Sequence, residues 1–335
     1  MMKYVFDPAK LAHYGVTPED LALATDEQKS LSDTMRPSVT YWRDALRRFR
    51  KNKMALFMLA LLMVIVLSAV FGPIISPYTY KGQSEDVRQG PSIEHLLGTD
   101  KLGRDIFVRV MFGTRISLLV GFLTMILVCL IGITYGSIAA YFGKLCDDLM
   151  MRFVDLMMTI PSLLIIIIFS VVIREPVMRL LNNKNFYMLA SMGAGLVSIF
   201  LVLALFNWLS MARAVRGALI TNRRQEYVLV AEGMGATSKW VIVKHLLPNS
   251  IGIIIINATA IIPSAIMTES FLSFIGLGVN APVPSLGSMA SDALNGIAAY
   301  PQNMIYPATL ISLIIMSFNV IGDALRDALD PRLRK

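Results

Sequence analysis

Few side chains in this sequence could carry out chemistry, and their spacing forms no catalytic or metal-binding set. The histidines, His13, His95 and His245, have no second histidine or catalytic acid at a useful spacing, and Cys129 and Cys146 form no CxxC pair. Redox and zinc chemistry are therefore excluded. We predict no catalytic residue, no metal and no cofactor.

One stretch has the glycine spacing of a phosphate-binding loop. Residues 98–105 read GTDKLGRD, which places two glycines as in G-x-x-x-x-G-K-[ST] but lacks the lysine and the hydroxyl that contact phosphate and magnesium. The chain lacks the means to hydrolyse ATP, and we predict that it is not an enzyme. Energy for any transport must come from a partner or from an ion gradient.

Glu269 is the ionisable residue that lies deepest within an apolar stretch. Burying a carboxylate in a membrane costs at least about a few kcal/mol, so such groups usually face a cavity or a partner. We therefore predict Glu269 as a pore or gating residue, with a structural hydrogen bond near the outer boundary as the alternative. Asp155 is better explained by a local ion pair with Arg152 at the membrane surface.

The elements that position these residues are membrane-spanning helices. Hydrophobic residues make up 55% of the 335 residues and charged residues only 16%, whereas a soluble domain carries about 25% charged residues. A helix needs about 20 mainly apolar residues to cross the bilayer. Six stretches meet this length, at residues 54–75, 116–142, 153–173, 185–212, 251–275 and 304–320. They predict an all-α polytopic membrane protein with six transmembrane helices.

The placement of charge predicts the topology. Most Lys and Arg residues lie on the side of the membrane that holds the N-terminus, so the positive-inside rule puts both chain ends in the cytoplasm. Residues 1–53 form a predicted cytoplasmic tail that ends in a basic juxtamembrane helix, and residues 54–335 form the membrane domain. That helix either docks on anionic lipid or only sets the topology. No nucleic-acid-binding motif accompanies it, so nucleic acid is not an expected partner.

Residues 213–250 form the longest predicted cytoplasmic excursion between spans. Asn222 and Gln225 have the spacing of a capping box, which predicts a short helix that ends near Gly233 or Gly235.

A second short helix is predicted in the same loop. Ser238 caps it, it covers residues 239–247, and Pro248 ends it. Exposed apolar residues on two short helices indicate either a docking surface for another protein or packing against the chain's own spans.

The sequence of this loop resembles that of the cytoplasmic EAA loop of ABC-importer permeases, whose pattern is E-A-A, three residues, G, nine residues and I-x-L-P. Residues 225–235 read QEYVLVAEGMG, and HLLPN follows after nine further residues. Ala231, Gly235 and Pro248 fit this pattern. His245 stands in place of the isoleucine, as in the peptide-importer branch of the family.

Further blocks, in the right order, resemble the C-type permeases of oligopeptide and dipeptide importers. They are LGTDKLGRDIF at 97–107, GTRIS at 113–117, ESFLSFIGLG at 269–278, PSLG at 284–287 and FNVIGD at 318–323. The resemblance covers about residues 41–334. The segment over 174–187 is longer and more polar than the family leads us to expect.

This resemblance implies a type I ABC-importer permease fold and a subunit that forms half of a pore in the bacterial inner membrane. It implies as partners a second related permease subunit, two cytoplasmic ATPase subunits, an extracytoplasmic substrate-binding protein and membrane lipid. Oligopeptides or dipeptides are the implied substrates, and relatives of this type are also associated with nickel and glutathione. The residues carried over as the coupling helix are Glu226, Tyr227, Ala231, Glu232, Gly233, Met234 and Gly235, with Pro248 in the supporting helix.

Two other classes stay open on the residues alone. A gradient-driven secondary transporter or channel would use Glu269 and Asp155 to carry protons or ions, although the sequence has no obvious inverted repeat. A non-transporting membrane scaffold would have no accessible central path.

Overall fold

The computed structural model describes residues 41–182, 193–279 and 281–329. The chain divides into two compact units, Met1–Asp44 and Ala45–Lys335. Residues 1–40 of the predicted tail over 1–53, and the end of the 174–187 segment, lie outside the described residues. The predicted division of the chain after residue 53 stays a prediction.

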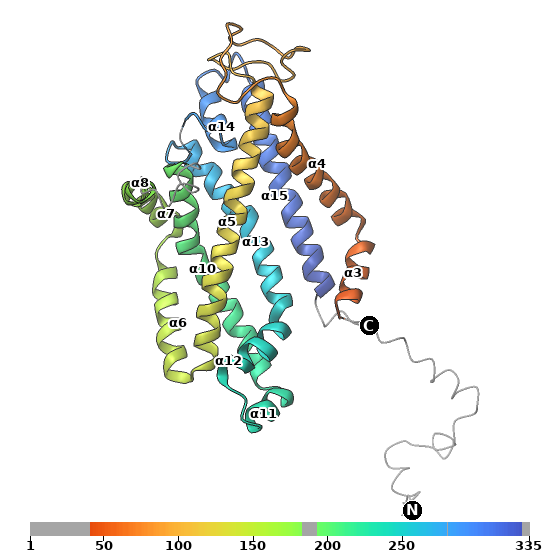
Figure 1. The fold of residues 1–335 in the computed structure, drawn as a ribbon, viewed down its shortest axis with the longest axis vertical. Helices are drawn as coiled ribbons and strands as arrows, with labels where there is room; N and C mark the ends of the chain where they lie inside the picture. Colours follow the sequence, from red (N-terminus) through yellow and green to blue (C-terminus); the bar gives the residue numbers. More distant parts are fainter. Residues whose placement is uncertain (1–40, 183–192, 280, 330–335) are drawn as a thin grey trace, which may run out of the picture. The chain divides into compact units, whose positions relative to one another are not determined.

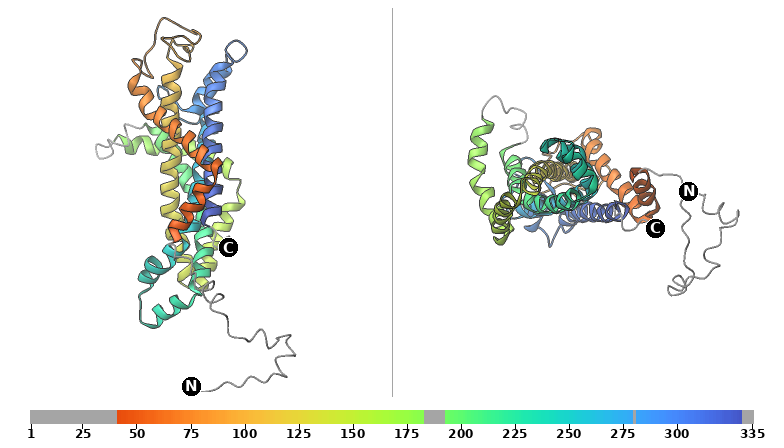
Figure 2. Two further views of the ribbon diagram at one scale, coloured as in Figure 1. Left: turned by 90° about the vertical axis from the view of Figure 1, so that its right-hand side faces the viewer. Right: turned by 90° about the horizontal axis from the view of Figure 1, so that it is seen from below.

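Five helices are long and apolar enough to cross a membrane, and Figures 1 and 2 show them running side by side. They are α4 (Lys53–Ile75), α5 (Ile106–Tyr141), α10 (Ala194–Arg223), α13 (Leu247–Phe274) and α15 (Gln302–Leu329). The described residues contain no β-strand. These findings confirm the predicted all-α polytopic class. Helices suit a membrane span because every backbone polar group must be paired within the segment.

Shorter helices connect and extend the long ones. They are α3 (Tyr41–Lys51), α6 (Lys144–Thr159), α7 (Ser162–Val172), α8 (Arg174–Leu181), α11 (Glu226–Gly233), α12 (Ser238–Val241), the π-helix η2 (Ile242–Leu246) and α14 (Leu286–Leu294). Helices α11 and α12 lie at one end of the bundle, here the α11 end, and α14 lies at the other, the α14 end (Figure 1).

The stretch predicted as one span over 153–173 is not a straight helix. Helices α6 and α7 meet at an angle of 87°, so the bundle has five spans, or six if this bent pair counts as one. The cause is Pro161, which has no N–H to donate and forces the preceding residue out of the helical conformation. Ile160 accordingly adopts an extended backbone (φ −82°, ψ 132°).

The predicted basic juxtamembrane helix forms as α3, which ends two residues before α4 begins. The residue between them, Asn52, is the N-cap of α4, and its side chain accepts a hydrogen bond from the backbone N–H of Ala55 at 3.1 Å. Docking of α3 on lipid stays a prediction.

Helices α5 and α10 form the most extensive helix pair of the core. Two glycines of α5 permit this close approach, because a Cβ at Gly132 would lie 2.6 Å from Cγ of Met211, and a Cβ at Gly136 would lie 2.5 Å from the carbonyl oxygen of Ala212. The small-residue pair on α5 therefore serves packing within the chain.

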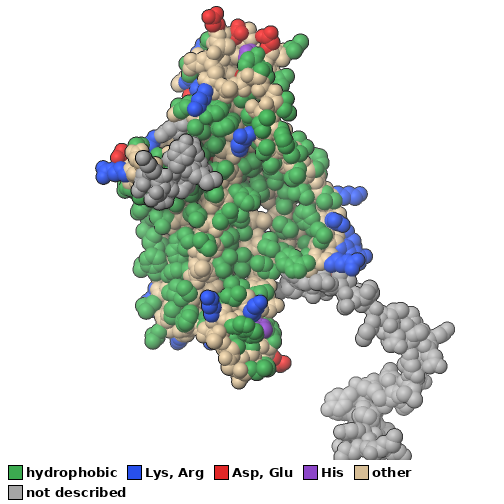
Figure 3. All heavy atoms as spheres, viewed as in Figure 1, with side chains coloured by type: hydrophobic (Ala, Val, Ile, Leu, Met, Phe, Trp, Pro, Cys, Tyr) green, Lys and Arg blue, Asp and Glu red, His purple; other side chains and the backbone are tan. Residues whose placement is uncertain are grey.

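Hydrophobic side chains cover most of the visible face along the long helices (Figure 3). Charged side chains gather toward the ends of these helices on that face. This distribution fits a belt that contacts lipid hydrocarbon between two polar boundary layers.

Candidate functional site

The loop after α10 contains the first predicted short helix, now seen as α11. Gly235 ends it with φ +85°, a left-handed conformation that glycine adopts without steric cost. The N–H of Ala236 donates to the carbonyl of Ala231, and the N–H of Gly235 donates to that of Glu232. These two bonds form a Schellman motif. The prediction that the helix ends near Gly233 or Gly235 is confirmed, because Gly233 is its last residue and Gly235 is the left-handed residue that follows.

The predicted capping box does not form. Helix α10 continues to Arg223, which places Asn222 in its last turn, and the Asn222 amide donates to the hydroxyl of Ser250 at 2.8 Å. Gln225 is the N-cap of α11, but its side chain makes no capping hydrogen bond. Asn222 instead ties the two ends of the loop together.

Pro248 does not end the second helix, which also lacks the predicted Ser238 cap because Ser238 is its first residue. The chain runs from α12 through the π-helix η2 directly into α13, where Pro248 lies in the first turn. In η2 the N–H of Leu247 donates to the carbonyl of Ile242, five residues back. The wider turn lets the helix continue past a residue that cannot donate a backbone hydrogen bond.

Helices α11 and α12 enclose an open hollow of about 580 Å³, the coupling hollow. Four of the predicted coupling residues line it, and they are Tyr227, Ala231, Met234 and Gly235. Tyr227 and Ala231 lie four residues apart on one face of α11, and the C-cap residue Met234 continues that face three residues later. Met234 is 83% exposed, and with the exposed side chains of Val230 and Trp240 it forms an apolar patch of the kind that a partner covers.

Five further residues line the coupling hollow, and none of them was among the predicted coupling residues. They are Val230, Ala236, Thr237, Trp240 and His245. The rings of Trp240 and His245 meet edge to face with centroids 4.7 Å apart. His245 Nε2 is buried and has no hydrogen-bond partner among the described residues. Partial burial raises the pKa of Tyr227, opposed by a hydrogen bond with Asn249, so its hydroxyl keeps its proton at neutral pH.

The opposite face of α11 is fixed to the bundle. Val228 is fully buried, and Glu232 accepts a hydrogen bond from the hydroxyl of Tyr141 at 3.0 Å. The Arg223 guanidinium lies 4.4 Å from the Tyr141 ring centroid and 3.8 Å from a Glu232 carboxylate oxygen. Glu232 therefore connects α11 to the ends of α5 and α10 and does not face the hollow.

The remaining predicted coupling residues lie apart from the hollow. Glu226 and Gly233 are exposed on α11, and Pro248 is exposed at the start of α13. Their contact with a partner stays a prediction.

A second hollow, of about 140 Å³, lies between α10 and α13, about midway along both helices. Polar side chains of both helices line this path hollow, and they are Asn207, Ser210, Asn257 and Ser264. Polar groups facing hydrocarbon are costly, so this face is suited to water or another protein subunit. The sequence signal that could have found it is amide and hydroxyl residues at helical spacing within two uncharged spans.

Glu269 lies on α13 in a cage of serine hydroxyls. Its side chain is fully buried and accepts hydrogen bonds from Ser117 of α5 and from Ser273, both at 2.8 Å. Ser270 lies 3.5 Å away. This geometry supplies the hydrogen bonds of the structural interpretation, and the gating role of Glu269 stays a prediction.

Asp155 pairs with a different partner from the one predicted. Its carboxylate lies 2.5 Å from Arg213 of α10, so the ion pair joins α6 to α10 instead of staying within α6. A second pair, Arg216 with Asp147, joins the same two helices through two hydrogen bonds.

Long apolar helices with a polar hollow between two of them, and a helical loop with an open apolar hollow, define a multi-pass membrane transport subunit. The chain belongs to the family described as the binding-protein-dependent transport system inner membrane component, which matches residues 132–335. Residues 40–91 match the N-terminal TM domain of oligopeptide transport permease C. Because this family comprises membrane components of ABC importers, membership decides against the gradient-driven alternative.

Curated relatives match along most of the chain. The oligopeptide transport system permease protein OppC of Bacillus subtilis is 41% identical over 299 residues, covering 89% of this chain and 92% of the relative. The dipeptide transport system permease protein DppC of the same organism is 40% identical and covers 96% of both chains. OppC of Escherichia coli is 34% identical, over 88% of this chain and 92% of the relative.

Substitutions at Glu269 separate a structural from a charge-dependent role. A glutamine can keep the hydrogen bonds to Ser117 and Ser273, so Glu269→Gln is expected to retain both stability and transport. Glu269→Leu leaves these hydroxyls without their buried partner and is expected to lower the free energy of unfolding by about 1–3 kcal/mol. Thermal unfolding of the purified complex and solute uptake in vesicles measure the two effects. Loss of uptake in a stable Glu269→Gln protein would instead indicate that gating needs the carboxylate.

Proposed function

We propose that this chain forms half of the pore of an ATP-driven importer of oligopeptides or dipeptides in the bacterial cell membrane. Its relatives in Bacillus subtilis are named for oligopeptide and dipeptide transport, which supports the substrate class. A second related permease subunit completes the pore, and an extracytoplasmic binding protein delivers the peptide. The α11 end and both chain termini face the cytoplasm in this proposal, in accord with the positive-inside rule.

The coupling hollow is the observation that carries the proposal. Its apolar lining is exposed on one face of α11, while Val228 and Glu232 fix the other face to the bundle. Such a helix can receive force from a partner and pass it to α5 and α10. The partners are two cytoplasmic ATPase subunits, each bound to the loop of one permease, and ATP hydrolysis takes place on them.

The path hollow supplies the second part of the mechanism. Amide side chains of Asn207 and Asn257 donate back to carbonyls of their own helices at 2.9 and 2.8 Å. Amide and hydroxyl groups can exchange hydrogen bonds with a passing peptide backbone without binding one side chain tightly. This face of α10 and α13 lines the translocation path between the two permeases.

Purification from membranes tests the proposal. We expect the tagged chain to co-purify with a second permease and an ATPase, and the reconstituted complex to take up peptide only with ATP and a peptide-loaded binding protein. The test variant is Met234→Glu, which places a charge in the apolar coupling hollow. It is expected to stay in the membrane but to lose the bound ATPase, whereas the wild-type chain keeps it. Uptake driven by an ion gradient in vesicles that hold this chain alone would contradict the proposal.

A further inference from the structure

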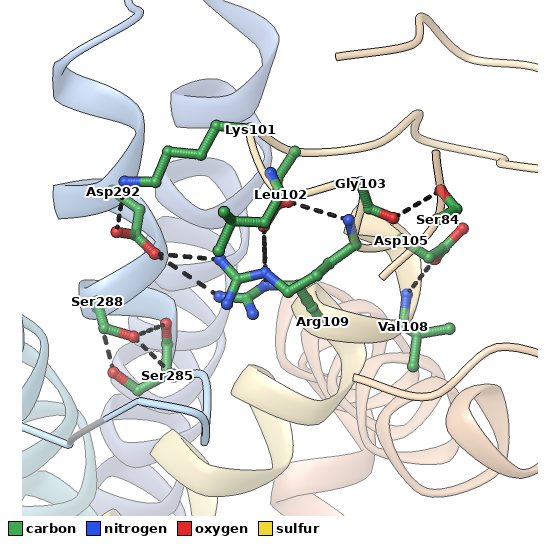
Figure 4. A network of polar contacts seen from close by, with 12 residues as sticks. Ser84, Lys101, Leu102, Gly103, Asp105, Val108, Arg109, Ser285, Ser288 and Asp292 are labelled. Carbon is green, nitrogen blue, oxygen red and sulfur yellow. Dashed lines mark hydrogen bonds and ion pairs between the residues drawn. The ribbon is translucent and has the colours of Figure 1, made fainter. Parts of the chain in front are cut away.

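A third hollow lies at the α14 end of the bundle, between the loop before α5 and helix α14 (Figure 4). Its volume is about 60 Å³, which is room for a few waters or one carboxyl group but not for a peptide. Two carboxylates and three cations line it. The carboxylates are Asp100 and Asp292, and the cations are Arg88, Lys101 and Arg109. Arg104 lies beside the hollow, with its guanidinium 3.8 Å from Asp292.

Asp100 lies 3.6 Å from the Arg109 guanidinium and offsets part of the positive charge, but its oxygens already accept hydrogen bonds from other groups. One oxygen accepts hydrogen bonds from the backbone N–H groups of Leu102 at 2.8 Å and Arg104 at 3.0 Å. The other accepts the Arg104 Nε at 2.7 Å. Asp100 thus holds the turn that leads into α5.

Asp292 compensates the cations only in part. Its side chain is 46% exposed, and Lys101 reaches one oxygen at 3.3 Å (Figure 4). The guanidinium groups of Arg104 and Arg109 lie 3.8 and 3.7 Å from the other oxygen, which is too far for a hydrogen bond.

The guanidinium of Arg109 has a hydrogen-bond donor that the described residues leave unused and that a further ligand could occupy. Its side chain is 4% exposed, and its Nη1 is buried with no hydrogen-bond partner among the described residues. The guanidinium stays charged in proteins and presents a planar set of donors that matches a carboxylate. A buried donor of this kind is costly when it is left unpaired.

The rim of the hollow is held in an uncommon conformation. Arg88 has φ +59°, a left-handed value that non-glycine residues seldom adopt, and its N–H donates to the carbonyl of Asp100 at 3.1 Å. The Arg88 guanidinium lies 5.3 Å from the ring centroid of Tyr300. Such conformations persist where the surrounding structure imposes them, and they cluster at ligand sites.

We propose that this hollow receives the carboxylate of an Asp or Glu side chain that the extracytoplasmic binding protein presents when it docks. The inference rests on the proposed function, which places the α14 end outside the cytoplasm. Arg109 at the base binds the incoming carboxylate, and Arg88 and Lys101 at the rim attract it. Helix α5 extends from Arg109 to Tyr141, which contacts Glu232 of the coupling helix, so docking acts on an element that reaches α11.

The test measures ATPase activity of the complete reconstituted importer against the concentration of peptide-loaded binding protein. Arg109→Gln is expected to raise the half-saturating concentration at least about tenfold, because the incoming charge loses its buried partner. Asp292→Asn is expected to lower it several-fold, because the competing carboxylate is gone. Lys81→Gln, an exposed cation in the same loop outside the hollow, is the control and is expected to leave it unchanged.

The two variants are expected to change the half-saturating concentration in opposite directions, so the test stays decisive even if the Arg109→Gln importer assembles poorly. A higher half-saturating concentration for Asp292→Asn, or none of the expected shifts, would overturn the inference. A further outcome would also overturn the inference. In it, Arg109→Gln raises only the peptide concentration that is needed at saturating binding protein, and C-terminally amidated peptides abolish the difference from the wild type. The peptide's own carboxylate would then be the ligand. A wild-type importer that the binding protein does not stimulate would contradict the proposed function itself.

Discussion

A Gly235→Leu protein is expected to reach the membrane and yet lose at least about nine-tenths of peptide uptake. Gly235 has φ +85°, where an L-residue pays about 1–2 kcal/mol, so the Schellman motif that closes α11 opens. A Cβ at this position would meet no atom within 4 Å in the chain, so the fold of the bundle is not affected. The hollow beside Met234 then loses its shape, and ATP hydrolysis is uncoupled from transport.

The measurement compares uptake in vesicles with ATPase activity of the same preparation. The matched control is Gly143→Leu in the loop between α5 and α6, where φ is +95° and a Cβ would likewise meet nothing within 4 Å. Gly143 has ψ 173°, a conformation that L-residues adopt even more rarely, so this control imposes a large backbone strain outside the coupling hollow. It is expected to leave the ratio of uptake to ATPase activity unchanged. Normal uptake by the Gly235→Leu protein would refute the coupling role of this loop.

The second large effect is expected at the path hollow. The double variant Asn207→Leu with Asn257→Leu removes the two amides that line it, and peptide uptake is expected to fall at least about tenfold. Stability is expected to hold, because both amides donate only to carbonyls of their own helix turns in the described structure. ATPase activity that responds to the binding protein is expected to persist, because the coupling hollow is intact.

Uptake of a labelled peptide, measured together with thermal unfolding, checks this expectation. Thr134→Leu is the control, since Thr134 is an exposed residue of α5 whose hydroxyl also donates to its own helix and lies outside the hollow. If the double variant transported peptide as well as the control did, α10 and α13 would not line the path.

The apolar runs predicted most of the long helices, but charge misled the prediction of where α5 begins. The predicted span started at residue 116, whereas the helix starts at Ile106 and includes two arginines. Arg115 donates to the carbonyls of Ala69 and Val70 on α4, and Arg109 lies beside Asp100. Arg115 depends on partners 46 and 45 residues away, which no local pattern contains, and Arg109 depends on a carboxylate in the loop before the helix.

The candidate site divides in the same way. The glycine signal at Gly235 and the apolar spacing of α11 are local, so the sequence predicts them correctly. The contact of Glu232 with Tyr141 joins residues 91 positions apart, and the bond from Asn222 to Ser250 depends on where α10 ends. The roles of these polar residues follow from tertiary packing.

The π-helix η2 joins the loop to the membrane, so residues Ser238–Phe274 form one continuous helical element. Trp240, at one end of this element, lines the coupling hollow, and Asn257, farther along it, lines the path hollow. If η2 changed to an ordinary α-helical turn with one residue fewer, the two parts of this element would rotate relative to each other by about 100° about the helix axis. In the proposed function, a force applied at the coupling hollow is then expected to rotate the face of α13 that lines the path hollow.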